Sequence, residues 1–308
     1  MQEKEKLFSV AAVIVTYNRI EKLKVALESY EKQILLPEYI IVVNNCSNDS
    51  TKSYLEKWQE ESDKIKKIVI NTTENLGGSG GFYVGQEEAL KLDVEWIYIA
   101  DDDAYPEERY FENINKFILN YTTDNIAVVC GKVKQNNNYE NEHRAIITNA
   151  WKINFYRGLK NSDYNNDAIQ IDLVSYVGIL INKKALEKVG LVNKDYFIWQ
   201  DDIEHSLRLK NYGKLFCLSD TSILHDADNN HYGLSWKTYY FYRNRVNLIK
   251  KHFGFKALIL IFILAIKAIL CPLKGKSLVE VKMRLIAIKN GLFNKLGKHP
   301  IYKPGWKP

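Results

Sequence analysis

Three consecutive carboxylates, Asp101 to Asp103, follow directly after the apolar run from Trp96 to Ile99. Because neighbouring side chains of a strand point to opposite sides of a sheet, we expect Asp101 and Asp103 to face one way and Asp102 the other. Two converging carboxylates suit a hard divalent cation such as Mg²⁺ or Mn²⁺, which keeps open positions for the phosphates of a ligand. An acidic turn that caps a helix is the plain alternative, but the place at the end of a buried strand favours metal binding.

A glycine-rich segment, ENLGGSGGFYVG, runs from Glu74 to Gly85 and leads into a predicted helix over 82–90. Glycines let backbone N–H groups approach an anionic or sugar ligand closely. The segment matches neither the dinucleotide fingerprint GxGxxG nor the phosphate-binding loop that ends in GK[ST]. A flexible loop is the alternative, and the place of the segment before a helix is what favours a ligand contact.

Two asparagines, Asn44 and Asn45, end a second apolar run. An asparagine side chain offers both an acceptor and donors, which match the N–H and C=O edge of uracil or thymine. An Asx turn explains Asn45 equally well.

Two further aspartates, Asp201 and Asp202, follow an aromatic run that includes Trp199 (YFIWQDD). Asp201 can cap the helix that follows, whereas a partly buried carboxyl group with a tuned pKa can act as a general base. His225 follows another predicted strand. A lone histidine is most often structural, but a histidine together with two aspartates forms a plausible metal shell.

The elements that must position these residues alternate between strand and helix in the first third of the chain. Continuous apolar runs predict buried strands at Val10–Thr16, Tyr39–Val43, Ile65–Ile70 and Trp96–Ala100. Apolar periodicity and polar turn clusters predict helices over Arg19–Gln33, from Thr51 onward and over Phe82–Leu90. This alternation predicts an α/β fold with a mostly parallel central sheet and helices on both faces, which binds its ligand at the carboxyl ends of the strands.

After about residue 125 the pattern becomes mixed. Strands are predicted for IAVVCGKV, IDLVSYVGILIN and KLFCLSDTSIL, and helices over 201–213 and 238–252. The run over 257–266 is wholly apolar and is flanked by Lys256 and Lys267. It is too short to span a bilayer, which takes roughly 20 apolar residues. A core helix is one interpretation; a helix on a membrane surface is favoured, because basic residues surround and follow the run.

The composition is that of an ordinary globular protein. The chain has 308 residues, of which 46% are hydrophobic and 26% charged, and its net charge is +6. That length allows one large domain or two small ones. Four widely spaced cysteines argue against a zinc site or a disulfide framework. The charged N-terminal stretch lacks the apolar core of a signal peptide, so we expect an intracellular protein.

Together these motifs resemble the inverting family 2 glycosyltransferases, which have the Rossmann-like GT-A fold. The resemblance covers about Val10 to His252 and rests on VIVTYNR, VVNNCSNDST, DDD and the QDD before a helix, in that order. NLGGSGGF, DDDA, FIWQDD and the later histidine are most similar to the galactofuranosyltransferases that use UDP-galactofuranose. Rhamnosyltransferases that use dTDP-rhamnose are close relatives.

The resemblance implies a role for each candidate residue. A nucleotide-sugar would contact Thr16, Arg19, Asn44, Asn75, Gly77, Gly78 and Asp102. Asn44 stands where the family more often has an aspartate that binds the base, and its amide oxygen can still accept the uracil N–H. Mn²⁺ or Mg²⁺ would bind to Asp101, Asp103 and His225, as in a DXD motif. The catalytic base would be Asp202, with the acceptor close to Trp199 and Asp201.

We therefore expect a metal-dependent hexosyltransferase that moves galactofuranose onto a hydroxyl group of a growing bacterial surface glycan. The resemblance also implies a lipid-linked or oligosaccharide acceptor and a peripheral position on the inner face of the plasma membrane. Residues 1–235 would form the catalytic domain, with a nucleotide-sugar half of about 1–125 and an acceptor half of about 126–235. Residues 236–308 would form a basic, helical region.

Three alternatives remain at this point. A rhamnosyltransferase would share most of the motifs. A nucleotidyltransferase would carry a basic, glycine-rich loop near the first strand, and TYNRIEK is not one. A non-catalytic scaffold of a glycan assembly complex would have lost the metal and base residues, all of which are present. No nucleic-acid partner is expected, and the sequence leaves the oligomeric state open.

Overall fold

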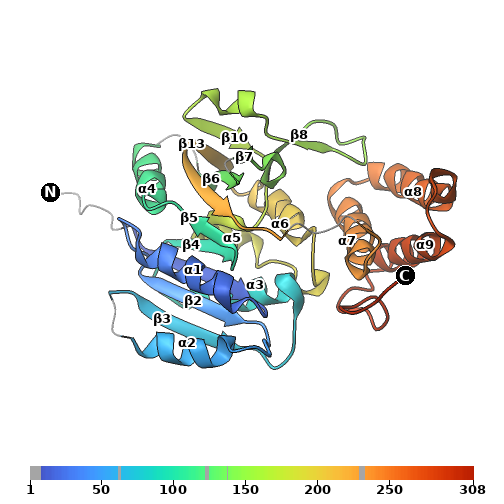
Figure 1. The fold of residues 1–308 in the computed structure, drawn as a ribbon. Coiled ribbons are helices and arrows are strands. Elements are labelled where there is room, and N and C mark those ends of the chain that lie inside the picture. The colour runs from blue at the N-terminus through green and yellow to red at the C-terminus, as the bar shows by residue number, and fades with distance from the viewer. Residues whose placement is uncertain (1–7, 62–63, 122–124, 137, 229–232) are drawn as a thin grey trace.

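The protein is built around one large mixed sheet. The computed structural model describes residues 8–61, 64–121, 125–136, 138–228 and 233–308. In these ranges the main sheet follows the order β10-β13-β6-β12-β4-β1-β2-β3, and β5 and β7 pair with β13 and β6 beside this path. Figure 1 shows helices on both faces of the sheet and a separate helical group, formed by the C-terminal part of the chain, beside it.

The first third of the chain alternates between strand and helix as predicted. Its elements are β1 (Val10–Thr16), α1 (Ile20–Glu31), β2 (Tyr39–Asn44), α2 (Thr51–Glu60), β3 (Lys66–Asn71), α3 (Gly77–Leu90) and β4 (Trp96–Asp101). The four strands pair in parallel, with β1 between β2 and β4. Their carboxyl ends therefore lie along one edge, where the predicted site residues follow them.

The middle of the chain adds antiparallel strands. Along the main sheet it contributes β5 (Ala104–Pro106), α4 (Tyr110–Asn120), β6 (Ile126–Gln135), β7 (Asn138–Tyr139), β10 (Ala168–Ile171), β12 (Val177–Asn182), α5 (Lys183–Val189), α6 (Asp201–Leu209) and β13 (Lys214–His225). Strand β12 is antiparallel to both β4 and β6, and β13 runs parallel to β6. A small second sheet consists of β8 (Arg144–Ile147), β9 (Tyr156–Gly158) and β11 (Leu173–Val174), and short 3₁₀ helices are η1 (Asn141–His143), η2 (Asn161–Asn165) and η3 (Lys194–Tyr196).

The last part of the described chain is helical. It consists of α7 (Trp236–His252), α8 (Lys256–Ile269), the 3₁₀ helix η4 (Cys271–Lys274) and α9 (Leu278–Leu292). Met283 and Ala287 of α9 pack with Tyr240 of α7 and with Phe197, which precedes α6. No helix in the described part of the chain is both long enough and apolar enough to cross a membrane.

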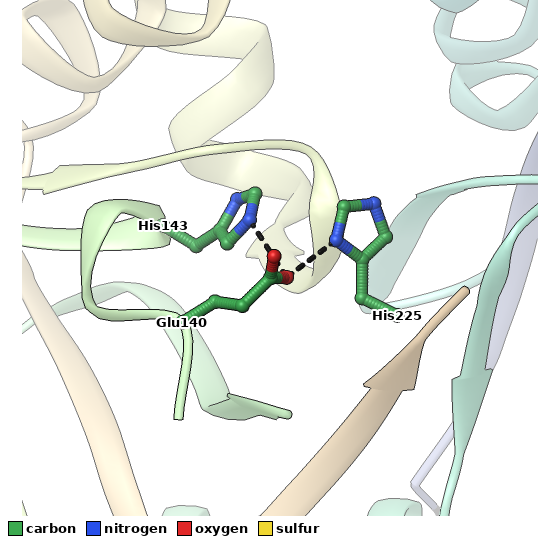
Figure 2. Close-up of side chains that lie close together, drawn as sticks. All are labelled: Glu140, His143 and His225. Atoms are coloured by element: carbon green, nitrogen blue, oxygen red, sulfur yellow. Dashed lines mark hydrogen bonds and ion pairs between the residues drawn. The ribbon is translucent and has the colours of Figure 1, made fainter. Parts of the chain in front are cut away.

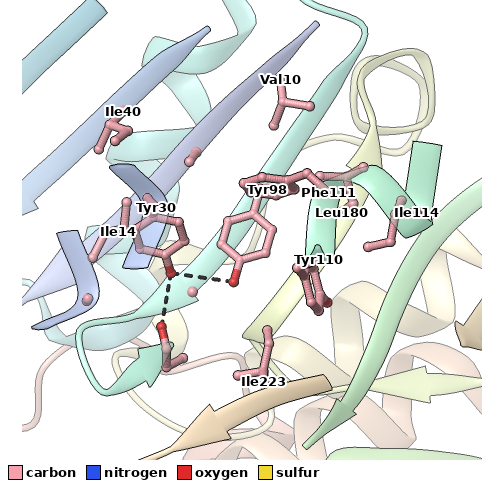
Figure 3. Packing of buried hydrophobic residues seen from close by; sticks show 14 of the residues in the cluster. Val10, Ile14, Tyr30, Ile40, Tyr98, Tyr110, Phe111, Ile114, Leu180 and Ile223 are labelled. Atoms are coloured by element: carbon pink, nitrogen blue, oxygen red, sulfur yellow. Dashed lines mark hydrogen bonds between the residues drawn. The ribbon is translucent and has the colours of Figure 1, made fainter. Parts of the chain in front are cut away.

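Two apolar layers cover the two faces of the main sheet. One packs α1, α2 and α4 against one face, and the other packs α3, α5 and α6 against the opposite face. In the first layer the hydroxyl of Tyr30 lies 3.4 Å from the hydroxyl of Tyr98 and donates to the carbonyl of Ala104 at 3.1 Å (Figure 3). This buried contact fixes the backbone directly after the three aspartates.

Helix α3 begins at Gly77 rather than at the predicted Phe82. A Cβ atom at Gly81 would overlap Val15, and one at Gly85 would overlap Val13. Both glycines therefore let α3 lie close against β1, which explains much of the glycine-rich segment by helix–sheet packing. Helix α6 ends at Leu209, before the predicted end at residue 213.

Candidate active site

A cavity of about 280 Å³ lies at the carboxyl ends of the parallel strands. Of the residues predicted to bind the ligand or the metal, its lining contains Thr16, Arg19, Asn75, Gly77, Gly78, Asp101 and Asp102. The lining also contains Asn45, for which the sequence left base recognition and an Asx turn open, and two residues that the sequence did not suggest, Trp236 and Lys237. These three come from the end of β2 and the start of α7, so the cavity has a C-terminal wall.

Arg19 holds two of the three consecutive aspartates. Its Nη1 lies 3.2 Å from Asp102 Oδ1 and 2.7 Å from Asp103 Oδ2, and Thr16 Oγ1 donates to Asp102 Oδ2 at 2.7 Å. The expectation that Asp101 and Asp103 share one side and Asp102 the other is wrong. Strand β4 ends at Asp101, so the alternation of side chains stops there, and the turn brings Asp102 and Asp103 to the same guanidinium.

The charges of this cluster are only partly compensated. Burial raises the pKa of Asp101 well above its usual range, and the charges of Asp103 and Asp102 raise it further. Burial likewise raises the pKa of Asp102 to about 6, although Arg19 and Thr16 oppose that rise. A ligand that brings positive charge to Asp101 would therefore be favoured.

His225, at the end of β13, lies between two acidic groups. Its Nε2 is 3.7 Å from Asp103 Oδ1, and its Nδ1 is 2.6 Å from Glu140 Oε2. The same Glu140 oxygen is 3.2 Å from His143 Nε2 (Figure 2). Burial would raise the pKa of Glu140, but hydrogen bonds from His143 and His225 lower it to about 2.

The donor set at Asp103 and His225 fits a divalent cation. Two ligands that each lie about 2.1 Å from one ion can be up to about 4.2 Å apart, so the 3.7 Å between Asp103 Oδ1 and His225 Nε2 leaves room for a shared ion. Asp101 is not part of a close cluster with Asp103 and His225 in this structure. Within the described ranges, the group of three or more possible ligands whose atoms all lie within 4.8 Å consists of Glu140, His143 and His225.

Asn44 does not line the cavity, whereas Asn45 does. The Asn44 side chain donates to Asn71 Oδ1 at 2.7 Å and accepts from the backbone of Ser47 at 3.1 Å. The Asn45 side chain ties the glycine-rich segment to β2, since it donates to the carbonyl of Gly77 at 3.0 Å and accepts from Leu76 at 2.9 Å. The predicted contact of Asn44 with a base remains a prediction.

Gly77 and Gly78 do different things. Gly77 has a φ of +72°, and a Cβ atom there would overlap the carbonyl group of Phe197. Gly77 therefore allows the start of α3 to contact the loop that contains Phe197, because any side chain would prevent that contact. Gly78 has open space on the side where a Cβ would point, so its backbone is accessible to a ligand in the cavity.

Asp201 and Asp202 begin α6 after a strained loop. Phe197, Trp199 and Gln200 all have φ between 64° and 67°, a region that costs non-glycine residues energy. Burial raises the pKa of Asp201 to about 6, and burial together with the charge of Asp201 raises the pKa of Asp202 to about 8. A carboxyl group with a pKa near the working pH has the property of a general base.

Helix α7 holds this strained loop in place. The Asn244 side-chain amide donates to the carbonyls of Tyr196 at 3.0 Å, Ile198 at 2.9 Å and Trp199 at 2.8 Å. Arg245 donates to Gln200 Oε1 at 3.1 Å. The buried polar residues of α7 thus replace the backbone partners that a regular element would supply.

Lys237 lines the cavity, whereas Trp199 does not line it but lies beside Lys237. The Trp199 side chain is 44% exposed, which leaves its ring available to a second ligand. Lys237 Nζ lies 5.8 Å from the centroid of that ring, and burial lowers the pKa of Lys237. The sequence gives a weak signal for this wall, the basic and aromatic start of a helix at SWK, and it gives none for the pairing of Glu140 with His225.

Comparisons with known proteins agree with this geometry. The sequence profile described as "Glycosyl transferase family 2" matches residues 11–190. Galactofuranosyltransferase GlfT1 of Mycolicibacterium smegmatis is 25% identical over 230 residues, which cover 72% of this chain and 72% of that protein. The dTDP-rhamnosyl transferase RfbF of Shigella flexneri is 25% identical over 223 residues, which cover 70% of this chain and 69% of that protein.

Solved structures show the same fold. TarS of S. aureus (residues 1–349) superposes with a TM-score of 0.60 at 18% identity, covering 93% of this chain and 82% of that one. GalNAc-T7, solved with UDP, GalNAc and Mn²⁺, superposes with a TM-score of 0.66 at 16% identity, covering 94% of this chain and 57% of that one. At these identities the likeness establishes the fold alone, and the predicted GT-A architecture is confirmed.

Proposed function

Because this chain belongs to glycosyl transferase family 2 and is therefore a glycosyltransferase, we propose that it transfers galactofuranose with inversion from UDP-galactofuranose to a hydroxyl group of a growing bacterial surface glycan. The observation that carries the proposal is the cavity lined by Thr16, Arg19 and Asp101 together with Phe197 and Ile198, which precede α6. The similarity to galactofuranosyltransferase GlfT1 supports the choice of donor.

The donor would lie in the cavity with its base toward Thr16 and Asn45 and its diphosphate toward Asp101 and Lys237. Lys237 and the N–H groups at the start of α3 supply positive charge and donors for the phosphate oxygens. Asp101, Asp103 and His225 would hold Mn²⁺ or Mg²⁺. When bound, the ion supplies charge neutralisation for the leaving diphosphate.

Asp202 would remove the proton from the acceptor hydroxyl. Its carboxylate is held at the first turn of α6, where Asp202 Oδ1 accepts from the backbone of Ile203 at 2.7 Å. The acceptor oxygen then attacks the anomeric carbon from the face opposite the leaving diphosphate, and this single displacement inverts the configuration. Trp199 would stack on the acceptor sugar, and Asp201 would accept a hydrogen bond from it.

A rhamnosyltransferase that uses dTDP-rhamnose is the second candidate. The similarity to the dTDP-rhamnosyl transferase RfbF favours it. Uracil and thymine present the same N–H and C=O edge, so the side chains of Thr16 and Asn45 do not discriminate between the two donors.

We also propose that α8 and η4 hold the enzyme on an anionic membrane surface, where a lipid-linked acceptor would be found. One side of α8 packs in the protein through Leu260, Ile261 and Leu264. The other side and η4 carry exposed apolar side chains, including Phe262 at 66% and Leu273 at 83% exposure. Exposed Lys267, Lys274 and Lys276 flank them, and such lysines attract anionic lipids by about 1 kcal/mol each.

The remaining expectations also stand as proposals: a cytoplasmic-side location at the plasma membrane, a catalytic domain over 1–235 and a helical region over 236–308. The oligomeric state is left unassigned.

The test of the donor is to incubate the protein with Mn²⁺, an oligosaccharide acceptor and one nucleotide-sugar at a time, and to measure the released nucleoside diphosphate. Release of UDP from UDP-galactofuranose alone is expected, with the opposite anomeric configuration in the product by NMR. Release of dTDP from dTDP-rhamnose instead would transfer the proposal to the second candidate. An Asp202→Asn variant is the control for background hydrolysis.

A further inference from the structure

A row of hydrogen-bonded side chains runs from Ser175 through His143 and Glu140 to His225. Ser175 Oγ lies 2.6 Å from His143 Nδ1, His143 Nε2 lies 3.2 Å from Glu140 Oε2, and that oxygen lies 2.6 Å from His225 Nδ1. Figure 2 shows the Glu140 carboxylate between the two imidazole rings. The three ring and carboxylate side chains come from two segments far apart in sequence, η1 with the residue before it and the end of β13.

The hydrogen bonds in this row of side chains have a defined direction. A carboxylate oxygen only accepts hydrogen bonds, so the imidazole nitrogens that face Glu140 are the ones that carry the protons. His225 therefore has a proton on Nδ1, and its Nε2, which lies 3.7 Å from Asp103 Oδ1, is the nitrogen left to bind a cation. This is the tautomer in which the ring can bind a cation through Nε2.

The backbone around His143 is also held firmly in place. Arg144, which follows His143, is fully buried and donates to the carbonyls of His143 at 3.0 Å, Gly131 at 2.9 Å and Val177 at 2.7 Å. The backbone N–H of Ser175 donates to the carbonyl of His143 at 3.0 Å. The position of the His143 ring is thus set by the backbone rather than by a mobile loop.

We propose that Glu140, oriented by His143, is a positioning residue that fixes the tautomer and the ring orientation of His225, so that His225 Nε2 completes a cation site with Asp103 and Asp101. The inference rests on the proposed function, because it assigns residues to the cation of that same site. It explains why Glu140 faces the ring of His225, and it gives Glu140 no direct contact with the ion.

The test measures cation binding and the His225 tautomer, not turnover. Binding of Mn²⁺ in the presence of UDP is followed by electron paramagnetic resonance for the wild type and for Glu140→Gln. We expect Glu140→Gln to weaken Mn²⁺ binding by about 10- to 100-fold, the usual effect of losing a partner of a metal-bound histidine. The matched control is Glu142→Gln, which removes the same charge from an exposed neighbour on η1 and should bind Mn²⁺ like the wild type.

His143 offers a graded comparison. His143→Gln keeps an amide that can donate to Glu140, so it should retain more Mn²⁺ affinity than His143→Ala. In metal-free protein, ¹⁵N NMR of the histidine rings should show His225 protonated at Nδ1 in the wild type and a mixture of tautomers in Glu140→Gln. Circular dichroism confirms that each variant is folded.

Three results would overturn the inference. The first is a Glu140→Gln variant that binds Mn²⁺ within about twofold of the wild type. The second is loss of Mn²⁺ binding in Glu140→Gln and His143→Ala with no change in Asp103→Asn, because the ion would then sit among Glu140, His143 and His225. The third is a mixed His225 tautomer in the wild type. Failure of the wild type to bind Mn²⁺ with UDP is distinguishable, since it would refute the metal-dependent function itself.

Discussion

Asp202→Asn should make the protein inactive and, at the same time, more stable. An asparagine has the shape of the aspartate and keeps an oxygen that can accept from the Ile203 N–H at 2.7 Å, but it has no charge to bury and cannot take a proton. Loss of a general base lowers kcat by about 10²- to 10⁴-fold. Because the proposed mechanism places Asp202 at the acceptor rather than at the donor, we expect the affinity for UDP to stay within about twofold.

The gain in stability follows from the pKa. The pKa of Asp202 is raised from 3.8 to about 8, and each step of one in pKa corresponds to about 1.4 kcal/mol, so burying the charge costs at most about 6 kcal/mol. Asp201 causes part of that rise and the side chain is not fully buried. We therefore expect Asp202→Asn to raise the free energy of unfolding by about 1–3 kcal/mol at pH 8.5.

The pH dependence has a definite sign. A carboxyl group with a raised pKa holds its proton in the folded state where the unfolded state has lost it, so the stability of the wild type falls as the pH rises from about 4 to about 8. The advantage of Asp202→Asn should accordingly be smaller at pH 5.5 than at pH 8.5. Activity should change in the opposite direction, with kcat/KM for the acceptor rising with pH toward a plateau above about 8.

Urea unfolding at pH 5.5 and 8.5 measures the stabilities, and UDP release at saturating donor measures kcat. The control is Asp167→Asn, which removes one exposed carboxylate and should change neither quantity. The reasoning fails if Asp202→Asn is no more stable than the wild type at pH 8.5, or if it keeps more than about a tenth of the wild-type kcat.

Three further predictions concern the two loops and the surface of α8. Gly77→Ala should lower the free energy of unfolding by at least about 2 kcal/mol, because a Cβ would meet the carbonyl of Phe197 at a φ of +72°; Gly78→Ala, with open space at its Cβ, should fold normally and weaken only UDP binding by calorimetry. Asn244→Ala should cost about 2–4 kcal/mol in urea unfolding and lower kcat, since it removes the side-chain donor to the carbonyls of Ile198 and Trp199, whereas the carbonyl of Tyr196 keeps Arg243; unchanged kcat would show that the loop needs no such support. Phe262→Glu should reduce co-sedimentation with phosphatidylglycerol vesicles at low salt by at least about fivefold, whereas Leu119→Glu, at an exposed apolar position on α4, should not. Equal loss in both variants, or a wild-type protein that does not co-sediment, would contradict the membrane proposal.

The strands could be predicted from sequence because their signal is local. A continuous apolar run that is rich in β-branched residues, such as Val10–Thr16, is typical of a strand that is buried on both faces of a parallel sheet. The boundaries of the functional loops are less local. Whether Asp103 shares a side with Asp101 depends on the residue at which β4 ends, and the next strand, β5, pairs with β13, far along the chain.

The parts of the site that the sequence did not reveal depend on contacts between distant segments. Glu140 faces His225 only because β6, β7 and β13 lie together in the sheet. The pattern of the glycine-rich segment favours a ligand-binding loop, but Gly81 and Gly85 serve the packing of α3 on β1, and Gly77 serves the contact with Phe197. A glycine marks a place without room for a side chain, and the sequence does not say whether a ligand or the protein fills that room.

Helix α7 links the two halves of the proposed reaction. Its first turn places Trp236 and Lys237 in the wall of the donor cavity, and Asn244, two turns further on, holds the loop that carries Trp199 and leads into Asp202. The two positions are about 10 Å apart along one rigid helix, at 1.5 Å per residue. In the proposed mechanism the distance between the donor phosphates and Asp202 is therefore set by α7 as well as by the sheet, so we expect a shift of this helix to change donor binding and catalysis together.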